Sequence, residues 1–232
     1  MRREAQRRSA DDVVLWPKAV DSQTCAGWIE GAYAARDAWT PNFDGVQFTL
    51  GRAYYTHLEE DRVAEYFAGA ASSDALVERA MPGLQGCMQR LLSALLQAPI
   101  ERRPGWCGPG LHIFPAGDWL SKHGGDVHFD TEGLAPEDRD ARTPALSAIL
   151  MLQPPQRGGG LRIWDTAYAG DDTVADEVVR AAPHQTIDYR PGDLLVLDSY
   201  RLHQIQPFTG PLDRLSVTAH LVLYDSRWQI WF

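Results

Sequence analysis

Two histidines and one aspartate have the types and spacing of a metal-binding site. His128 and Asp130 are separated by one residue, and His203 follows far downstream. Two imidazoles and one carboxylate can bind one face of an octahedral metal ion and leave its other coordination positions open. The three residues therefore predict a site where a divalent metal ion can also bind small molecules.

An arginine lies where it can bind an acidic ligand beside that metal. Arg214 comes 214 − 203 = 11 residues after His203, on the next predicted strand. Its planar guanidinium group can form two parallel hydrogen bonds to one carboxylate. A charged side chain on the interior face of a small barrel is costly unless it is paired, and an anionic ligand would supply that pair.

The strands predicted around these residues would bring them together. Residues 127–131 alternate as in a β-strand, which places His128 and Asp130 on one face. The alternation continues in residues 214–221, where one face is polar and carries Arg214, Ser216, Thr218 and His220. The opposite face is apolar and carries Leu215, Val217, Ala219 and Leu221.

The His-x-Asp spacing alone is a weak signal in a chain with 7 histidines. Taken by itself, Asp130 is typical of a solvated turn and His128 of a half-buried strand. The wider order of motifs is more specific, and it comprises Phe114-Pro115-Ala116-Gly117-Asp118, His128-x-Asp130, Gly158-Gly159-Gly160-Leu161, Pro191-Gly192-Asp193, His203 and Arg214-x-Ser216.

With these motifs, the segment from about residue 105 to residue 224 resembles the 2-oxoglutarate/Fe(II)-dependent oxygenases, and within them the prolyl-4-hydroxylase-like branch. The resemblance implies a mainly β chain with flanking helices, built on a double-stranded β-helix (jelly-roll, cupin-like) core with the N-terminal helices packed outside. It also implies that Fe(II) is bound by His128, Asp130 and His203. By the same resemblance, Arg214 and Ser216 hold the distal carboxylate of 2-oxoglutarate, and O2 is the second co-substrate.

Two departures from the family pattern matter. The family often has tyrosine where this chain has Phe114, so one hydroxyl contact to 2-oxoglutarate is expected to be missing. Many relatives place the metal histidine at the position of His123, which would put Gly125 where the carboxylate belongs, as in related halogenases. We prefer His128, because Asp130 supplies a third ligand and the segment has strand character.

With Asp130 as the third ligand, hydroxylation is favoured over halogenation. The compact chain and its acidic surface favour a small-molecule substrate such as a free amino acid, a small peptide or a natural product. Four alternatives stay open at this point. They are a prolyl or peptidyl hydroxylase acting on a protein, a halogenase using His123 and Gly125, a non-catalytic barrel that binds a small acid or a metal, and a zinc or manganese hydrolase or lyase.

The length, charge and cysteine content of the chain limit the classes of protein to which it can belong. The chain has 232 residues, 44% of them hydrophobic, which is enough for one substantial core. A net charge of −9 argues against a nucleic-acid partner, and no segment approaches the roughly 18–20 apolar residues of a membrane span. Three cysteines in apolar contexts are expected to be free thiols, which favours a cytoplasmic location.

The organisation predicted is a flexible tail over residues 1–12 and a single domain over 13–232, divided into a support region (13–104) and the β-helix core (105–232). Helices are expected at 21–38, 61–68 and 74–97, the last broken near Pro82. Strands are expected at 13–16, 48–57, 108–115, 126–131, 145–153, 160–165, 185–189, 193–198, 202–208 and 214–224.

Some side chains outside the motifs also carry expectations. His57 is expected on a surface strand, with the alternative that it points at the substrate. His112 and His220 are expected as hydrogen-bonded core residues, with the alternative that either lines the pocket. Trp119 is expected in the core, with the alternative that it forms a wall for a hydrophobic substrate. The apolar residues 228–232 are expected to pack back on the barrel or to join a second subunit in a homodimer.

Overall fold

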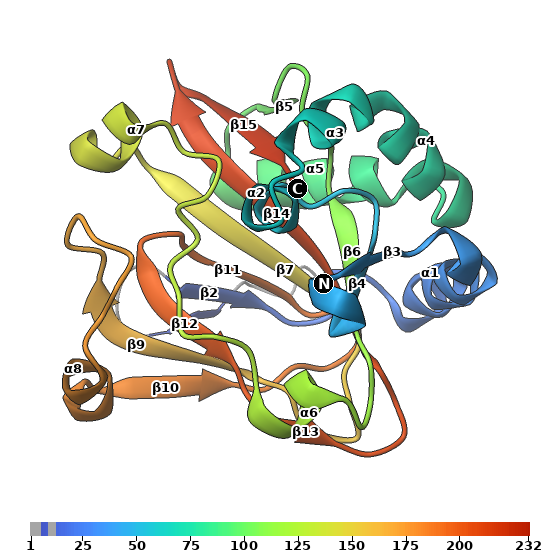
Figure 1. Cartoon of the computed structure of the whole chain (residues 1–232). Coiled ribbons are helices and arrows are strands. Elements are labelled where there is room, and N and C mark those ends of the chain that lie inside the picture. Colours follow the sequence, from blue (N-terminus) through green and yellow to red (C-terminus); the bar gives the residue numbers. More distant parts are fainter. Residues whose placement is uncertain (1–5, 9–12) are drawn as a thin grey trace.

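A long, mostly antiparallel sheet organises the computed structural model, which describes residues 6–8 and 13–232 (Figure 1). Its main path runs β1 (Gln6–Arg8), β2 (Val13–Trp16), β11 (Leu194–Asp198), β7 (Ala145–Gln153), β14 (Arg214–Tyr224), β6 (Gly110–Phe114), β4 (Gln47–Leu50) and β3 (Thr40–Asn42). Off this path, β15 (Arg227–Trp231) pairs with β14 and, in parallel, with β5 (Ile100–Arg102).

A smaller sheet lies across from the large one (Figure 1). It consists of β10 (His184–Ile187), β9 (Leu161–Ala167) and β12 (Arg201–Ile205), all paired antiparallel. A short pair, β8 (Arg157–Gly158) and β13 (Phe208–Thr209), continues this layer. The two layers enclose the space into which one face of β14 points.

Helices gather on the other face of the large sheet (Figure 1). They are α1 (Ser22–Ala34), α3 (Val63–Ala68), α4 (Ala70–Ala80) and α5 (Leu84–Leu96). Elsewhere lie α2 (Tyr54–Glu59), α6 (Trp119–His123), α7 (Pro136–Ala141), α8 (Asp176–Ala181) and the 3-10 turns Arg36–Ala38 and Phe43–Gly45. Within the described ranges, no helix has the length and apolarity needed to cross a membrane.

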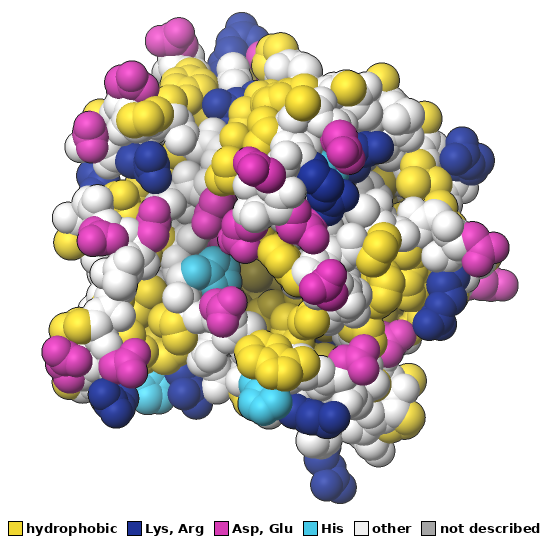
Figure 2. All heavy atoms as spheres, viewed as in Figure 1, with side chains coloured by type: hydrophobic (Ala, Val, Ile, Leu, Met, Phe, Trp, Pro, Cys, Tyr) yellow, Lys and Arg dark blue, Asp and Glu magenta, His cyan; other side chains and the backbone are white. Residues whose placement is uncertain are grey.

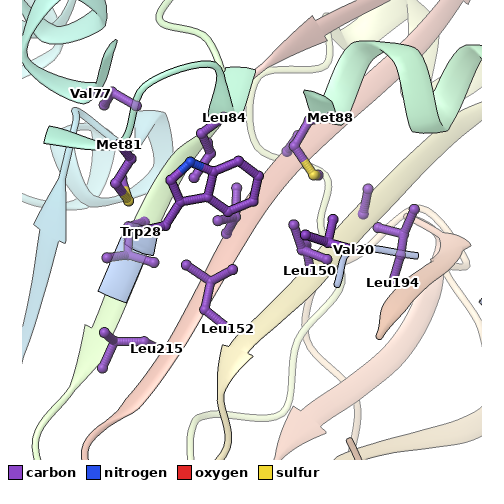
Figure 3. Packing of buried hydrophobic residues seen from close by; sticks show 14 of the residues in the cluster. Val20, Trp28, Val77, Met81, Leu84, Met88, Leu150, Leu152, Leu194 and Leu215 are labelled. Atoms are coloured by element: carbon purple, nitrogen blue, oxygen red, sulfur yellow. The ribbon is translucent and has the colours of Figure 1, made fainter. Parts of the chain in front are cut away.

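The main core forms between these helices and the sheet (Figure 3). Trp28 of α1 and Met88 of α5 are buried against Leu150 of β7 and Leu215 of β14. The Trp28 indole donates to the Pro82 carbonyl at 3.0 Å, which satisfies its polar atom in the core. Every second residue of β14 packs into this core, so the alternation predicted for this strand is confirmed. The polar face of β14 points away from the core and can line a site.

Several element predictions are confirmed closely. The predicted strands at 13–16, 145–153 and 214–224 coincide with β2, β7 and β14. Asp21 begins the first helix as its N-cap, with its Oδ1 accepting from the Thr24 amide at 2.9 Å. The break predicted near Pro82 separates α4 from α5, where Gly83 adopts a φ of 75°.

Two element predictions are wrong. The extended segment predicted at 48–57 ends at Leu50, because Gly51 adopts a φ of 93° and the chain then turns into α2. The strand predicted at 126–131 is not a regular strand, since within it only His128 pairs, through an isolated bridge to His203.

The predictions for the N-terminal and the C-terminal segment have different outcomes. Of the tail predicted at 1–12, residues 1–5 and 9–12 lie outside the described residues, and Gln6–Arg8 pairs with β2. The C-terminal segment packs back on the barrel, as β15 pairs with β14 and Phe232 is buried. The predicted single domain stays a prediction.

Candidate metal and co-substrate site

Three side chains converge at the edge of the cavity between the sheets. One ligand atom from each of His128, Asp130 and His203 lies within 4.8 Å of the others. Asp130 sits between the two imidazoles, with Oδ1 3.5 Å from His128 Nε2 and Oδ2 3.3 Å from His203 Nε2. This is the group that the sequence predicted as metal ligands.

Backbone pairing places the first two ligands beside the third. The amide of His128 donates to the His203 carbonyl at 3.1 Å, and the amide of His203 donates back at 2.9 Å. The Asp130 amide donates to the Ser199 carbonyl at 3.0 Å. The irregular segment is therefore fixed against β12 and the turn before it, although it forms no strand of its own.

Both imidazoles are oriented by a hydrogen bond on the nitrogen that faces away from Asp130. His128 Nδ1 donates to the Asp126 carbonyl at 2.9 Å, and His203 Nδ1 donates to the Arg201 carbonyl at 2.8 Å. A carbonyl can only accept, so the proton of each neutral ring is on Nδ1 and the Nε2 lone pair is available. This is the arrangement that metal-binding histidines use.

The charges of the cluster fit a bound cation. Burial raises the pKa of Asp130, but His203, His220 and His128 outweigh burial and hold it well below its usual range. Burial opposes a charge on His128, yet the hydrogen bond and charge of Asp130 raise its pKa to about 9. Without a metal, a proton on His128 offsets the charge of Asp130, and a divalent cation would replace it.

Arg214 is buried and forms an ion pair with no carboxylate of the described residues. Its side chain is 1% exposed, its Nε donates to the Gly159 carbonyl at 2.9 Å, and its Nη1 donates to Ser216 Oγ at 2.9 Å. Its Nη2 has no hydrogen-bond partner in the described part of the chain. A buried guanidinium with a free donor is costly, so the site fits an anionic ligand that accepts from it.

The triad and Arg214 open into one cavity of about 440 Å³. Its walls come from both sheets, with Ile149 of β7, Leu161 of β9 and Ile205 of β12 among its apolar residues. The polar face of β14 contributes Arg214, Ser216, Thr218 and His220. A metal at one end and an acid anchored at Arg214 can therefore share this space.

The two histidines considered as metal ligands lie in different surroundings. His123 is exposed at the end of α6, where its Nδ1 donates to the Trp119 carbonyl at 2.8 Å and its ring stacks on the Trp119 indole. It does not belong to the converging group, whereas His128 does. Gly125 lines the cavity, but His123, two residues before it, is not among the residues that line it.

Expectations for three other side chains, His57, Trp119 and His112, need correction. His57 lies on helix α2 and is fully buried, with its Nδ1 donating to the Ala53 carbonyl at 2.8 Å. Trp119 is 54% exposed and lines the cavity, because α6 lies at its rim and not in the core. His112 is buried and lines the cavity, but its Nδ1 has no partner among the described residues. His220 also lines the cavity, and the expectation of a hydrogen-bonded core residue is confirmed, because it is buried and its Nδ1 lies 3.3 Å from Ser147 Oγ.

Sequence reasoning missed the residues that approach the cavity from the N-terminal region. Gln47 and Tyr55 line it and hydrogen bond to each other, and Glu59 follows on α2. Glu132 lines it from the polar loop after Asp130. Of these residues, only Glu132 could be expected near the site from the sequence, because it directly follows the segment predicted to bind the metal.

No protein-family model matches the chain, and no curated protein matches it. Similar solved structures include an N-substituted L-amino acid dioxygenase from Burkholderia ambifaria AMMD in complex with alpha-KG (TM-score 0.58, 15% identity, covering 95% of this chain and 86% of that one). A second is the non-heme alpha ketoglutarate dependent epimerase SnoN from nogalamycin biosynthesis (TM-score 0.53, 14% identity, covering 90% of this chain and 76% of that one). A third is a prolyl hydroxylase from Trichoplax adhaerens bound to a hypoxia inducible factor peptide fragment (TM-score 0.53, 13% identity, covering 89% of this chain and 81% of that one).

At these identities the likeness establishes a shared fold. The chain shares its mainly β fold with these dioxygenase, epimerase and prolyl hydroxylase structures, and the prediction of a mainly β chain with helices is confirmed. Its activity must be argued from its own residues.

Proposed function

We propose that the protein is an Fe(II)- and 2-oxoglutarate-dependent oxygenase. One observation carries the proposal: the His128, Asp130 and His203 group and the unpartnered guanidinium of Arg214 face the same cavity. Three ligands on one face of a metal leave positions for a chelating 2-oxo acid and for O2. The free donor of Arg214 then has a carboxylate to bind.

Each residue has a distinct role in this proposal. His128 and His203 would hold the metal through Nε2, and Asp130 through its carboxylate. Arg214 would bind the distal carboxylate of 2-oxoglutarate, with Ser216 fixing the guanidinium in place. When bound, Fe(II) with 2-oxoglutarate and O2 supplies oxidation of a substrate C–H bond, coupled to decarboxylation of the co-substrate to succinate.

The chain contributes positioning and exclusion of water. The Nδ1 hydrogen bonds of both histidines fix the direction of their lone pairs before a metal arrives. The rings of Phe114 and Tyr189 lie 5.4 and 5.7 Å from the Arg214 guanidinium carbon and shield it from solvent. A charge-assisted hydrogen bond is stronger in such a dry place than at a surface.

The substrate proposed is a small molecule, such as a free amino acid, a small peptide or a natural product. A cavity of about 440 Å³ accommodates a small organic molecule next to the co-substrate. Because Asp130 occupies the third ligand position, hydroxyl transfer is favoured over halogenation. Action on a prolyl residue of a protein is the alternative.

Anaerobic crystals grown with Fe(II) and 2-oxoglutarate test the proposal. We expect iron on His128, Asp130 and His203, and a carboxylate of 2-oxoglutarate on Arg214. A metal bound elsewhere, or an Arg214 without a carboxylate partner, would rule out this assignment.

A further inference from the structure

The cavity carries more negative charge than the proposed metal and co-substrate require. Its charged lining residues are Arg214 and four carboxylates, Glu59, Asp126, Asp130 and Glu132. A divalent metal and Arg214 balance the charges of Asp130 and of dianionic 2-oxoglutarate. Three further carboxylates then line the cavity, of which Glu59 and Asp126 are exposed and Glu132 is half-buried.

These three carboxylates come from separate segments and line the same cavity. Glu59 ends helix α2, Asp126 follows helix α6, and Glu132 follows the metal ligand Asp130. In the described ranges, none of them forms an ion pair with a lysine or arginine at 4.0 Å or less. Figure 2 shows the hollow on this face bordered by acidic side chains, with hydrophobic side chains inside it.

A second observation indicates that a polar ligand group enters the same cavity. The His112 side chain lines it and is 5% exposed, yet its Nδ1 has no hydrogen-bond partner among the described residues. The ring is held by Phe114, on which it stacks at 5.8 Å, and by an edge contact with Phe232 at 4.9 Å. A buried ring atom of this kind needs a partner, and no protein group supplies one.

The outer wall of the cavity is apolar. It is formed by Phe43, Val46, Trp119, Leu120 and Ile205. Trp119 is 54% exposed, so an apolar ligand body would cover surface that now faces water. Its ring face can also attract a cation.

We propose that the substrate is a small organic ammonium compound, with a protonated amine on an apolar carbon skeleton. This inference rests on the proposed oxygenase function, whose active-site cavity it fills. The amine is bound at the mouth by Glu59, Asp126 and Glu132, and the skeleton lies on the apolar wall. An anionic substrate is excluded by the same three carboxylates, because like charges in a partly desolvated site repel.

Matched probes that differ only in their head group test this. Alkylammonium ions from butyl to octyl are compared with the alcohols and carboxylates of equal length by calorimetry. The protein is loaded with Mn(II) and 2-oxoglutarate, so that binding is measured without turnover. We expect at least one ammonium ion to bind about tenfold tighter than its alcohol, and no carboxylate to bind better than its alcohol.

Isosteric variants assign the effect to the carboxylates. Glu132→Gln and Glu59→Gln should each reduce the preference for ammonium over alcohol several-fold, and Glu59→Lys should remove it. Glu30→Gln, an exposed position on α1 outside the cavity, should leave the preference unchanged. The proposal is wrong if no ammonium ion binds more tightly than its alcohol, or if the preference survives in all three cavity variants.

This result can be told apart from a failure of the oxygenase proposal. If the ammonium preference is absent while iron-dependent conversion of 2-oxoglutarate to succinate is present, only the substrate class is wrong. If ammonium ions bind as expected but no succinate forms with any of them, the cavity is a cation-binding site and the oxygenase proposal fails.

Discussion

His128 and His203 donate a backbone amide to each other's carbonyl, at 3.1 and 2.9 Å, and their rings lie 4.3 Å apart. This bridge joins the irregular segment that carries two predicted ligands to the strand that carries the third. The geometry of the metal site therefore depends on main-chain pairing as well as on the three side chains.

The first prediction concerns the metal ligands. His128→Ala, Asp130→Ala and His203→Ala should each weaken Fe(II) binding by about tenfold or more. Loss of a group that only hydrogen bonds to a metal ligand already has an effect of that size, and loss of the ligand itself has a larger one. The backbone bridge persists in the variants, so the circular dichroism spectrum should stay unchanged. Binding is measured by anaerobic calorimetry.

His123→Ala is the control for this experiment, because His123 is exposed and lies outside the converging group. It should bind Fe(II) as the natural chain does. If His123→Ala loses the metal and His128→Ala retains it, the ligand assignment is wrong and the halogenase-like alternative gains support.

The core strands and the site were predictable to different degrees. The alternation of residues 214–224 fixed both faces of β14, because one face is used by the helices and the other by the cavity. The segment around His128 could not be predicted in the same way. Its alternation is that of a strand, but the chain there is held by a single bridge that depends on a distant partner.

The N-terminal contribution to the cavity was also beyond sequence reasoning. The β-branched and aromatic residues before His57 favour an extended segment, and only the positive φ at Gly51 turns the chain into α2. That turn brings Tyr55 and Glu59 to the cavity. Local propensity does not encode such a long-range placement.

The second prediction concerns Arg214. Removing a buried charge-assisted hydrogen bond strands a carboxylate, so Arg214→Ala should weaken 2-oxoglutarate binding by about a hundredfold. Arg214→Lys should restore only part of the affinity, since an ammonium group cannot form the planar fork. Unchanged 2-oxoglutarate affinity in the alanine variant, measured by calorimetry with Mn(II), would exclude Arg214 as the anchor.

The third prediction concerns the type of reaction. In Asp130→Gly the carboxylate is lost and a coordination position can accept chloride or water. Hydroxylation should be lost, and halogenated product should be absent, because one substitution does not place the substrate for halide transfer. The natural chain should show no dependence on chloride in product analysis by mass spectrometry. Chlorinated product from the natural chain would overturn the assignment of Asp130.

The fourth prediction concerns stability in acid. Burial lowers the pKa of His112 to about 3, whereas an unfolded chain takes up this proton near pH 6.5. Above about pH 6.5 the His112 ring is neutral in the folded and the unfolded chain, so it does not change the free energy of unfolding. Below that pH the unfolded chain binds the proton and the folded chain does not, so the free energy of unfolding falls as the pH drops toward 3. One such group contributes up to about 1.4 kcal/mol per pH unit.

His112→Phe removes this proton and keeps an aromatic ring beside Phe114 and Phe232. Its free energy of unfolding, from urea titrations of the metal-free protein, should fall less steeply below about pH 6.5. The exposed His184 provides the control, and His184→Asn should leave the slope unchanged. Equal slopes for His112→Phe and the natural chain would show that His112 is not held neutral.

The fifth prediction concerns the contact between helices α1 and α4. A Cβ on Gly31 would lie 1.9 Å from the Ala80 carbonyl oxygen, so Gly31→Ala should destabilise the fold by about 1–3 kcal/mol. Gly27→Ala on the same helix meets nothing within 4 Å and should be stabilising by up to about 1 kcal/mol. Urea titration measures both, and a neutral Gly31→Ala would show that the two helices can separate without cost.

The most direct test of the oxygenase proposal is the formation of succinate from 2-oxoglutarate. The purified chain is supplied with Fe(II), 2-oxoglutarate, O2 and a panel of small amines, and succinate is quantified by mass spectrometry. We predict succinate that requires both iron and O2, is lost in Asp130→Ala and persists in His123→Ala. Succinate formation that is equal in the natural chain and in Asp130→Ala, or none under any condition, would contradict the proposed function.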